Sequence, residues 1–434
     1  MFKNYIKIAL RNLTKHKRYS LINILGLGIG LACFILIMLW VQDELSYDRF
    51  HKNSNDIYLI IRNSYEKSDA STSRLLSSAL KTNLPEVVNA TSFTPLPDPF
   101  KVYIKYQDRS LEENIALAEP QFFEIFSFDF LEGNPQSAFK DPNSIIMTER
   151  MSQKYFGDKN PLGESISLSM LGQERILKVT GILKNIPRNS HIRRELFVPI
   201  EFIKSYGINW NSWYSQTVHT YIQTQDKIDI PQLEKKISDC KLRNYDEENV
   251  SYMLLPLTKI HLHATNIVYF ATTGDIKYVY IFSMIAGIIL LIACINYMNL
   301  SNALSLKRAK EIGIQKVIGA QRIQLMRQYF GETFILTIIA LVCGVFLVEL
   351  FLPVLNQLSG KSLSMDFLNP QFIIAILLIT IITCIISGLY PAVFVSGFKP
   401  IRVLKGKFHI SERGINLKKG LIVFQFALSI MIIV

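Results

Sequence analysis

Two histidines, His261 and His263, form the one pairing in the large polar region of this sequence that suggests chemistry. On a β-strand, residues two positions apart point to the same face, so the two rings could act together as metal ligands. No cysteine or carboxylate lies nearby in the sequence, and two histidines rarely hold a metal alone. We therefore favour packing and hydrogen bonding near a membrane surface, and predict no metal site.

The common motifs of catalysis are absent from the sequence. It has no nucleophile elbow, no HExxH pattern and no glycine-rich phosphate loop ending in Lys-Ser or Lys-Thr. We predict no catalytic residues, no cofactor bound by this chain and no enzymatic activity of its own.

A polar segment, residues 301–329, has the pattern of an amphipathic surface helix. One face would carry Leu306, Ala309, Gly313 and Val317, and the opposite face Arg308, Glu311 and Gln315. Gly319 would end this helix, and a second helix would begin at Gln321. Such a helix can dock in a groove of a soluble partner or lie on lipid headgroups. Glu311, in the middle of the polar face, favours the protein partner.

Four apolar runs must hold these residues in position. Each run has about 20 residues, which is the length that a helix needs to cross a bilayer. Their central portions contain no Asp, Glu, Lys, Arg or His. Coupling to ions or protons needs ionisable groups at that depth, so the energy for any motion must come from outside these helices. The predicted spans are residues 21–41, 278–300, 330–352 and 371–398.

Basic residues flank each apolar run on one side only, which predicts the orientation of the chain. The N-terminus would be cytoplasmic and residues 42–277 would lie outside. The formal charge of +12 then reflects membrane topology, and nucleic acid is a poor explanation for it. The remaining cytoplasmic segments would be residues 1–20, 301–329 and 399–419, with an outer loop at 353–370.

The outer region, residues 42–277, mixes short β-rich runs with helix-like segments. The sequence thus predicts a polytopic α-helical membrane protein with a large α+β domain inserted between its first two spans. This domain holds a single cysteine, Cys240, so no disulfide can form within it. The predicted strands are 57–61, 102–106, 144–147 and 179–183. The predicted helices are 149–156, with Thr148 as N-cap and Gly157 as its end, and 231–242, with Leu233, Ile237 and Cys240 on one face.

Small and polar residues in the spans indicate close helix packing. Gly26 and Gly30, four residues apart with Gly28 between them, allow another helix to approach. Packing within the subunit and contact with a second copy remain equal alternatives. Asn296 and Asn299 share a face of the second span and could hydrogen-bond to another helix.

The chain closes with an apolar stretch, residues 420–434, that is too short to span a bilayer. Its basic lead-in resembles the one before the first span. We interpret it as the start of a fifth span, in a longer protein whose second half repeats the first.

Several of these segments resemble the MacB/FtsX-like permeases of ABC transporters. Residues 295–333 carry the family signature, with its Arg308-Ala-Lys-Glu311-Ile-Gly313 core, its Gly319-Ala320 turn and Glu332. Residues 387–406 are similar to the family motif at the end of the fourth span. The stretches FDFLEGNPQSAFKDPNSIIMTERMSQKYFGDKNPLGESI and VTGILKNIPRNSH resemble the MacB-type periplasmic core domain. The histidine pair also fits a family pattern, which weakens the metal interpretation further.

The resemblance implies a four-span permease of the bacterial inner membrane, duplicated in some members, with ATP and Mg bound by a separate ATPase subunit. ATP-driven motion would pass to the periplasmic domain by mechanotransmission, to export or release an antibiotic, peptide or lipoprotein. The coupling residues would be Arg308, Glu311, Gly313, Lys316, Gly319 and Ala320. Expected partners are the ATPase, a second permease half or a homodimer, membrane lipids, and a periplasmic adaptor or outer-membrane duct.

Two other functions remain open at this point. An FtsX-like regulator would switch a periplasmic hydrolase or a signalling partner without moving a substrate. A structural membrane anchor would have no energy coupling at all.

Overall fold

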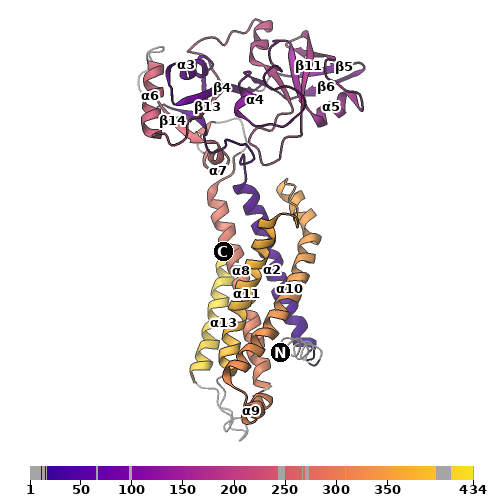
Figure 1. Ribbon diagram of the computed structural model, residues 1–434, viewed down its shortest axis with the longest axis vertical. Helices are drawn as coiled ribbons and strands as arrows, with labels where there is room; N and C mark the ends of the chain where they lie inside the picture. The colour runs from indigo at the N-terminus through magenta and orange to yellow at the C-terminus, as the bar shows by residue number, and fades with distance from the viewer. Residues whose placement is uncertain are drawn as a thin grey trace. The chain divides into compact units, whose positions relative to one another are not determined.

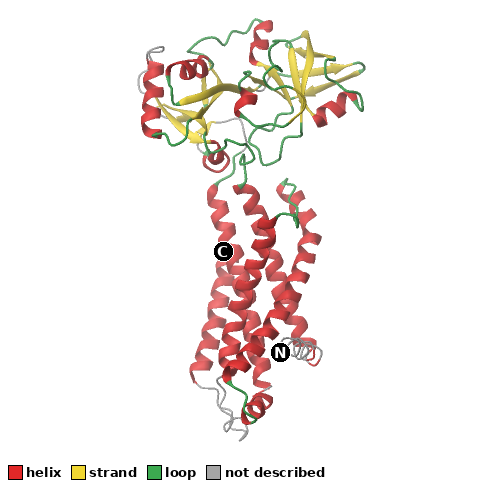
Figure 2. Ribbon diagram, in the orientation of Figure 1, coloured by secondary structure: helices red, strands yellow, loops and turns green. Residues whose placement is uncertain are grey.

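The computed structural model describes residues 11, 15, 17–64, 67–96, 100–242, 250–265, 267–268, 273–307, 309–396 and 412–433. The chain divides into two compact units (Figures 1 and 2). The helical unit comprises Met1–Gln42 and Lys277–Val434, and the sheet unit comprises Asp43–Ile276.

The helical unit is built from long apolar helices. Among the described residues, four helices are long and apolar enough to cross a membrane: α2 (Lys17–Leu45), α8 (Ile276–Lys307), α10 (Arg322–Ser359) and α11 (Pro370–Ser396). A short helix, α9 (Ala309–Val317), precedes α10, and α13 (Glu412–Ile433) closes the described chain. Pro391 lies inside α11 and does not end it. Helix α8 extends to Lys307 and helix α10 begins at Arg322. Both helices therefore continue beyond their apolar runs into the polar segment predicted at 301–329.

Glycines bring α2 close to two neighbouring helices. A β-carbon on Gly30 would lie 2.4 Å from the Cβ of Ala293 in α8. One on Gly28 would lie 3.1 Å from the carbonyl oxygen of Ala340 in α10. Gly26 has nothing within 4 Å of that position. Gly30 therefore packs within the subunit, while the space beside Gly26 is open.

The sheet unit contains a 15-stranded mixed sheet, mostly antiparallel, with the path β15-β2-β1-β13-β4-β7-β12-β9-β11-β10-β5-β6. Strands β14, β3 and β8 pair off this path with β1, β13 and β11. The parallel pairs are β9 with β11, β7 with β12 and β2 with β15. The strands are β1 (Ile57–Ser64), β2 (Lys67–Asp69), β3 (Ser71–Ser73), β4 (Val87–Pro95), β5 (Val102–Tyr106), β6 (Arg109–Glu113), β7 (Ile115–Ala118), β8 (Phe130–Gly133), β9 (Ser144–Thr148), β10 (Ser165–Met170), β11 (Gln173–Leu183), β12 (Leu196–Pro199), β13 (Gln216–Thr224), β14 (Ser251–Pro256) and β15 (Ile267–Val268).

Short helices cover the sheet in two lobes. In Figure 1, α3 (Leu75–Asn83) and α6 (Ile230–Leu242) lie beside β13 and β14, whereas α5 (Glu149–Phe156) lies near β11 and β6. An aromatic core forms between the lobes around α4 (Phe122–Ile125), where Phe93, Phe126 and Tyr221 are fully buried. The remaining helical segments are η1 (Ile200–Tyr206), η2 (Leu257–Lys259) and α7 (Ile260–His263).

The strands predicted in the outer region all appear, as parts or the whole of β1, β5, β9 and β11. Helix α5 also has the predicted bounds, but Thr148 makes no side-chain capping bond. Its hydroxyl lies 3.4 Å from the carboxylate of Glu195 instead. In α6, Leu233 and Ile237 are buried as predicted, and the side chain of Cys240 lies outside the described part of the chain.

The idea that His261 and His263 share one face of a strand is wrong, because both residues lie in helix α7. Residues two apart on a helix point about 200° apart, so the rings do not share a face. His261 is buried, stacks on Tyr47 with ring centroids 3.4 Å apart, and places Nε2 2.8 Å from Glu44 Oε2. His263 is exposed. No group of three or more His, Cys, Asp or Glu suited to a metal ion occurs among the described residues.

Candidate functional site

The hairpin of α9 and the start of α10 is fixed by its backbone. Gly319 has a φ of +102°, a conformation that residues with a side chain rarely adopt. Around it, the amide of Ala320 donates to the carbonyl of Gln315 at 3.0 Å, which closes the end of α9. A capping box between Gln321 and Gln324 then starts α10. The predicted break at Gly319 and the second helix from Gln321 thus have a local physical cause.

One side of this hairpin is packed against α11. Ile312, Leu325 and Tyr329 are buried in a small cluster with Ala392 of α11, and Ala320 packs at its edge. Gly313, which was predicted as a coupling residue, is also buried. The hairpin is therefore held by an apolar contact to the end of another long helix.

Two cations tie the same hairpin to the last residue of α11. Lys316 Nζ donates to the carbonyl oxygen of Ser396 at 2.7 Å, and Arg322 Nε donates to its hydroxyl at 3.2 Å. Carbonyls at a helix C-terminus lack partners within the helix and carry partial negative charge, so cations are favoured there. Partial burial lowers the pKa of Lys316, and the positive charge of the neighbouring Arg322 lowers it further. The structure thus gives Lys316 a role in holding the hairpin.

Glu311 lies on the surface of the hairpin. Its Oε1 is 2.8 Å from Lys15 Nζ, and the two side chains are 50% and 58% exposed. An exposed ion pair of this kind contributes only about 0–1 kcal/mol to stability. Arg308 and the side chains of Leu306 and Ala309 lie outside the described residues.

The hairpin also exposes four aliphatic side chains, Ile314, Val317, Ile318 and Ile323, which we call together the aliphatic patch. These side chains are 51%, 64%, 81% and 59% exposed. The sequence predicted Gly313 and Val317 on one apolar face, yet Gly313 is buried and Val317 is exposed. The apolar residues are therefore divided between an inner face on α11 and an outer face. Exposed apolar patches on otherwise polar elements mark interaction sites.

The two asparagines of α8 line a pocket beside α2. This pocket, of about 400 Å³, is bounded by Asn296, Asn299, Gly26 and Asn23 among others. Asn299 Oδ1 is buried there without a hydrogen-bond partner. The open space at Gly26 and the unsatisfied amide oxygen of Asn299 thus lie in the same pocket. An unsatisfied polar group costs free energy within hydrocarbon.

Two family models match the chain. One, described as the MacB-like periplasmic core domain, matches residues 20–239, just over half of the sequence. Another, described as the FtsX-like permease C-terminal, matches residues 283–400 and includes the hairpin. The chain belongs to the MacB/FtsX-like family of ABC transporter permeases.

Curated relatives of this permease agree with the family. The uncharacterized ABC transporter permease YknZ of Bacillus subtilis is 22% identical over 417 residues, which cover 92% of this chain and 98% of YknZ. The macrolide export ATP-binding/permease protein MacB of Neisseria meningitidis is 22% identical over 357 residues, covering 79% of this chain and 52% of MacB. The permease thus spans about half the length of that MacB.

Among solved structures, a domain of a putative permease from Porphyromonas gingivalis matches 54% of this chain and 98% of its own length. The TM-score is 0.42 and the sequence identity 19%.

Proposed function

We propose that this permease relays ATP-driven motion from a separate ATPase subunit to its periplasmic domain, for the export or release of a substrate. The observation that carries the proposal is the exposure of Ile314, Val317, Ile318 and Ile323 on a hairpin that is also packed and hydrogen-bonded to α11. An apolar patch with charged neighbours suits a groove on a soluble protein, with the charges fixing its register.

Contacts within the helical unit support such a relay. A force on the hairpin acts on α10 directly, because the hairpin continues into it, and on α11 through Ala392 and Ser396. It reaches α2 where Gly28 and Gly344 let the backbones of α2 and α10 approach closely. The chain of α2 continues into the sheet unit at Asp43, and the chain of that unit returns into α8. Motion of these helices would therefore be transmitted through covalent connections.

The proposed location is the bacterial inner membrane, with the N-terminus and the hairpin in the cytoplasm and the sheet unit in the periplasm. The charge asymmetry of the sequence supports this orientation. Apart from Glu44 near the end of α2, the buried polar residues of the described spans are Asn, Ser and Thr, which supports a mechanical relay over an ion-coupled route.

A second permease half, or a second copy, is the proposed partner of α2. Leu21, Ile22, Leu25 and Ile29 are exposed along this helix, beside the open space at Gly26. A helix placed there would cover apolar side chains and offer partners to the amide of Asn299.

The test is ATP turnover of a candidate ATPase, reconstituted with the full-length permease in lipid. Ile318→Glu places a charge on the most exposed residue of the patch, and we expect it to abolish the effect of the permease on turnover. Leu171→Glu is the matched control, since Leu171 is 58% exposed on a turn of the sheet unit. Glu311→Ala should have a smaller effect than Ile318→Glu, because its ion pair is exposed.

If the permease leaves turnover unchanged, or if both Glu variants act alike, the hairpin is not the coupling element. A structural anchor would then explain the chain better than a coupled permease.

A further inference from the structure

His261 contacts both segments through which the chain enters and leaves the sheet unit. The chain enters this unit at the last turn of α2, in what we call the entering segment, residues 43–48. It leaves the unit just before α8, in the leaving segment, residues 273–275. Helix α7, which carries His261, belongs to neither segment, so its contacts to them are tertiary.

The entering segment is held by the ring of His261. The Nε2 atom of this ring lies 2.8 Å from Glu44 Oε2, in the last turn of α2, and the ring is stacked on Tyr47 with an interplanar angle of 2°. All three side chains are buried. An N–H donor stabilises a buried carboxylate through a charge-assisted hydrogen bond, and the stacked rings add apolar contact. The end of α2 therefore has a fixed position against α7.

The leaving segment is held by the backbone of the same histidine. The amide of Gly274, two residues before α8, donates to the carbonyl oxygen of His261 at 2.8 Å. A β-carbon on Gly274 would lie 2.9 Å from Glu44 Oε2 and 3.1 Å from His261 Nε2. Gly274 thus lies directly against the Glu44–His261 pair, and the entering and leaving segments meet there.

The loop between β11 and β12 also binds the entering segment. Arg193 donates to the hydroxyl of Tyr47, and its guanidinium carbon lies 5.7 Å from the centre of the Tyr47 ring. The amide of Asp48 donates to the carbonyl of Asn189 at 2.9 Å. Because this loop leads into β12, a displacement of the entering segment would act on the sheet at β12 as well as at β1.

We propose that His261 is a positioning residue of the relay, which clamps the end of α2 to the segment before α8 so that both helices move the sheet unit together. We call Glu44, Tyr47, His261 and Gly274 the clamp. This inference rests on the proposed function, since it concerns how ATP-driven motion enters the sheet unit. Without the clamp, each helix would act through a separate single-chain link, and the two soft dihedral angles of every residue in that link would absorb the motion.

The first measurement is hydrogen exchange of the full-length permease in lipid, without ATPase. His261→Ala removes the ring that contacts Glu44 and Tyr47, so we expect exchange in the entering and leaving segments to rise about tenfold. Gly274→Ala should have a similar effect, because its methyl group displaces the Glu44 carboxylate. His261→Gln should recover part of the protection, since its amide can still donate to Glu44.

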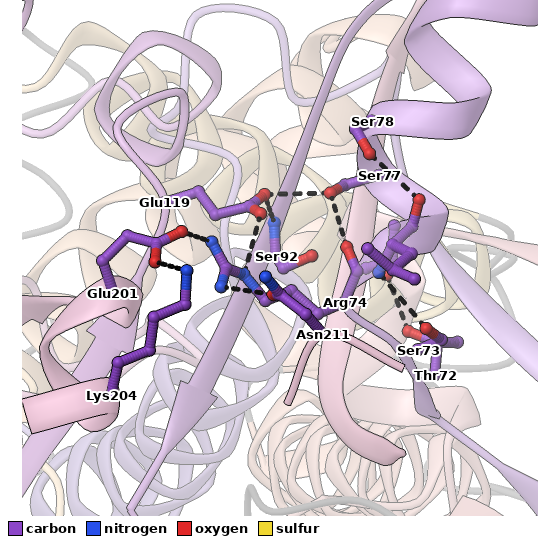
Figure 3. Close-up of polar contacts among 12 residues, drawn as sticks. Thr72, Ser73, Arg74, Ser77, Ser78, Ser92, Glu119, Glu201, Lys204 and Asn211 are labelled. Carbon is purple, nitrogen blue, oxygen red and sulfur yellow. Dashed lines mark hydrogen bonds and ion pairs between the residues drawn. The ribbon is translucent and has the colours of Figure 1, made fainter. Parts of the chain in front are cut away.

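Two variants control for a general loss of stability. His263→Ala changes an exposed histidine of the same helix. Arg74→Gln breaks another polar network of the sheet unit, shown in Figure 3, in which Arg74 pairs with Glu201 and places Nε 3.7 Å from Glu119 Oε1. None of the residues labelled in that figure belongs to the clamp. Arg74→Gln should therefore raise exchange in α3 and leave the entering and leaving segments unchanged.

The second measurement adds the candidate ATPase and compares exchange with and without ATP. In the unmodified chain, ATP should change exchange in the loop of residues 189–193, which the entering segment contacts. His261→Ala should reduce this change about fivefold or more. The same variant should still alter ATP turnover, because the hairpin itself is intact. His263→Ala and Arg74→Gln should keep both responses.

Unchanged exchange of the two segments in His261→Ala, or a full response of its 189–193 loop to ATP, would overturn the inference. So would an equal loss of that response in Arg74→Gln, which would indicate a general effect of stability. If His261→Ala does not fold, Gly274→Ala decides the question. If ATP changes nothing in the unmodified chain and turnover is unaffected, the proposed relay is wrong, and the first measurement still decides whether His261 clamps the two segments.

Discussion

The two units of this permease bury different kinds of polar side chain. The sheet unit buries ionisable side chains: Asp48 and His191 are 0% and 1% exposed, with Nδ1 of the histidine 2.9 Å from the carboxylate. In the helical unit, the buried polar residues among those described are all Asn, Ser or Thr. Thr337, for example, donates to the carbonyl of Thr333 in its own helix at 2.9 Å.

This difference follows from the surroundings of each unit. A domain folded from water can bury a charge when hydrogen bonds and a partner compensate it. A helix in hydrocarbon has no such exchange with water, so small residues and neutral hydroxyls provide the close contacts. The sheet unit should therefore depend on specific ionic contacts, and the helical unit on steric fit.

The largest expected effect is at Asp48. Its carboxylate accepts from the amide of His191 at 3.0 Å and from Ser190 Oγ at 3.2 Å, all in a buried site. Asp48→Ala should lower the free energy of unfolding of the sheet unit by about 3–5 kcal/mol, because buried polar partners lose their acceptor. Hydrogen exchange of β1 and β13 in the full-length chain measures this loss.

Asp48 also has a φ of 58°, which Asn tolerates better than Ala. Asp48→Asn therefore separates the loss of charge from backbone strain. Asp158→Ala, at an exposed position, should have almost no effect. Equal losses at Asp48 and Asp158 would contradict the dependence on ionic contacts.

The next largest effect is that of pH, which should change the stability of the sheet unit more than that of the helical unit. Burial lowers the pKa of His51 from 6.5 to about 4, against a smaller opposing effect of Asp48. Between these values the unfolded chain binds a proton that the folded chain does not, so the sheet unit loses stability as the pH falls from 6.5 to 4. The loss due to His51 is about 3 kcal/mol.

Hydrogen exchange at several pH values, corrected for intrinsic rates, measures this slope in β1. His51→Gln should reduce this slope without removing it, because burial also lowers the pKa of His219 to about 4. His263→Gln, at an exposed histidine, should leave the slope unchanged. Amides of α8 should keep their protection over the same range. An equal acid effect on both units would show that the buried histidines are not its cause.

The smallest expected effect tests steric fit in the helical unit. Gly30→Ala places a β-carbon 2.4 Å from that of Ala293, which requires a shift of the helices and should cost about 1–3 kcal/mol. Gly26→Ala is the matched control, because nothing lies within 4 Å of the new carbon. We expect it to be neutral or slightly stabilising, since alanine favours helix over glycine. Hydrogen exchange along α2 and α8 compares the two variants, and equal destabilisation would disprove the packing difference.

Much of the local structure was evident in the sequence. The four apolar helices and the strands at 57–61 and 102–106 follow from residue type and periodicity, which need no distant partner. The turn at Gly319, just after the end of α9, follows from the backbone freedom of one residue. The family signature at 295–333 also identified the class of protein before any contact was known.

Only the tertiary structure decided which residues that are far apart in the sequence contact each other. Thr148 has the residue type and position of an N-cap, but its hydroxyl lies by Glu195. Lys316 was predicted to form or shape the coupling segment, and only the fold shows that it binds Ser396, 80 residues away. His261 approaches Glu44, at a separation of 217 residues.

The division of the hairpin's apolar residues into a buried and an exposed face has the same origin. It depends on where α11 lies, and no periodicity within the hairpin contains that information. The sequence by itself determined the long apolar helices, four of the strands and the turn at Gly319, since those preferences are local. Only the folded chain decided which side chains meet, because that depends on packing between elements distant in sequence.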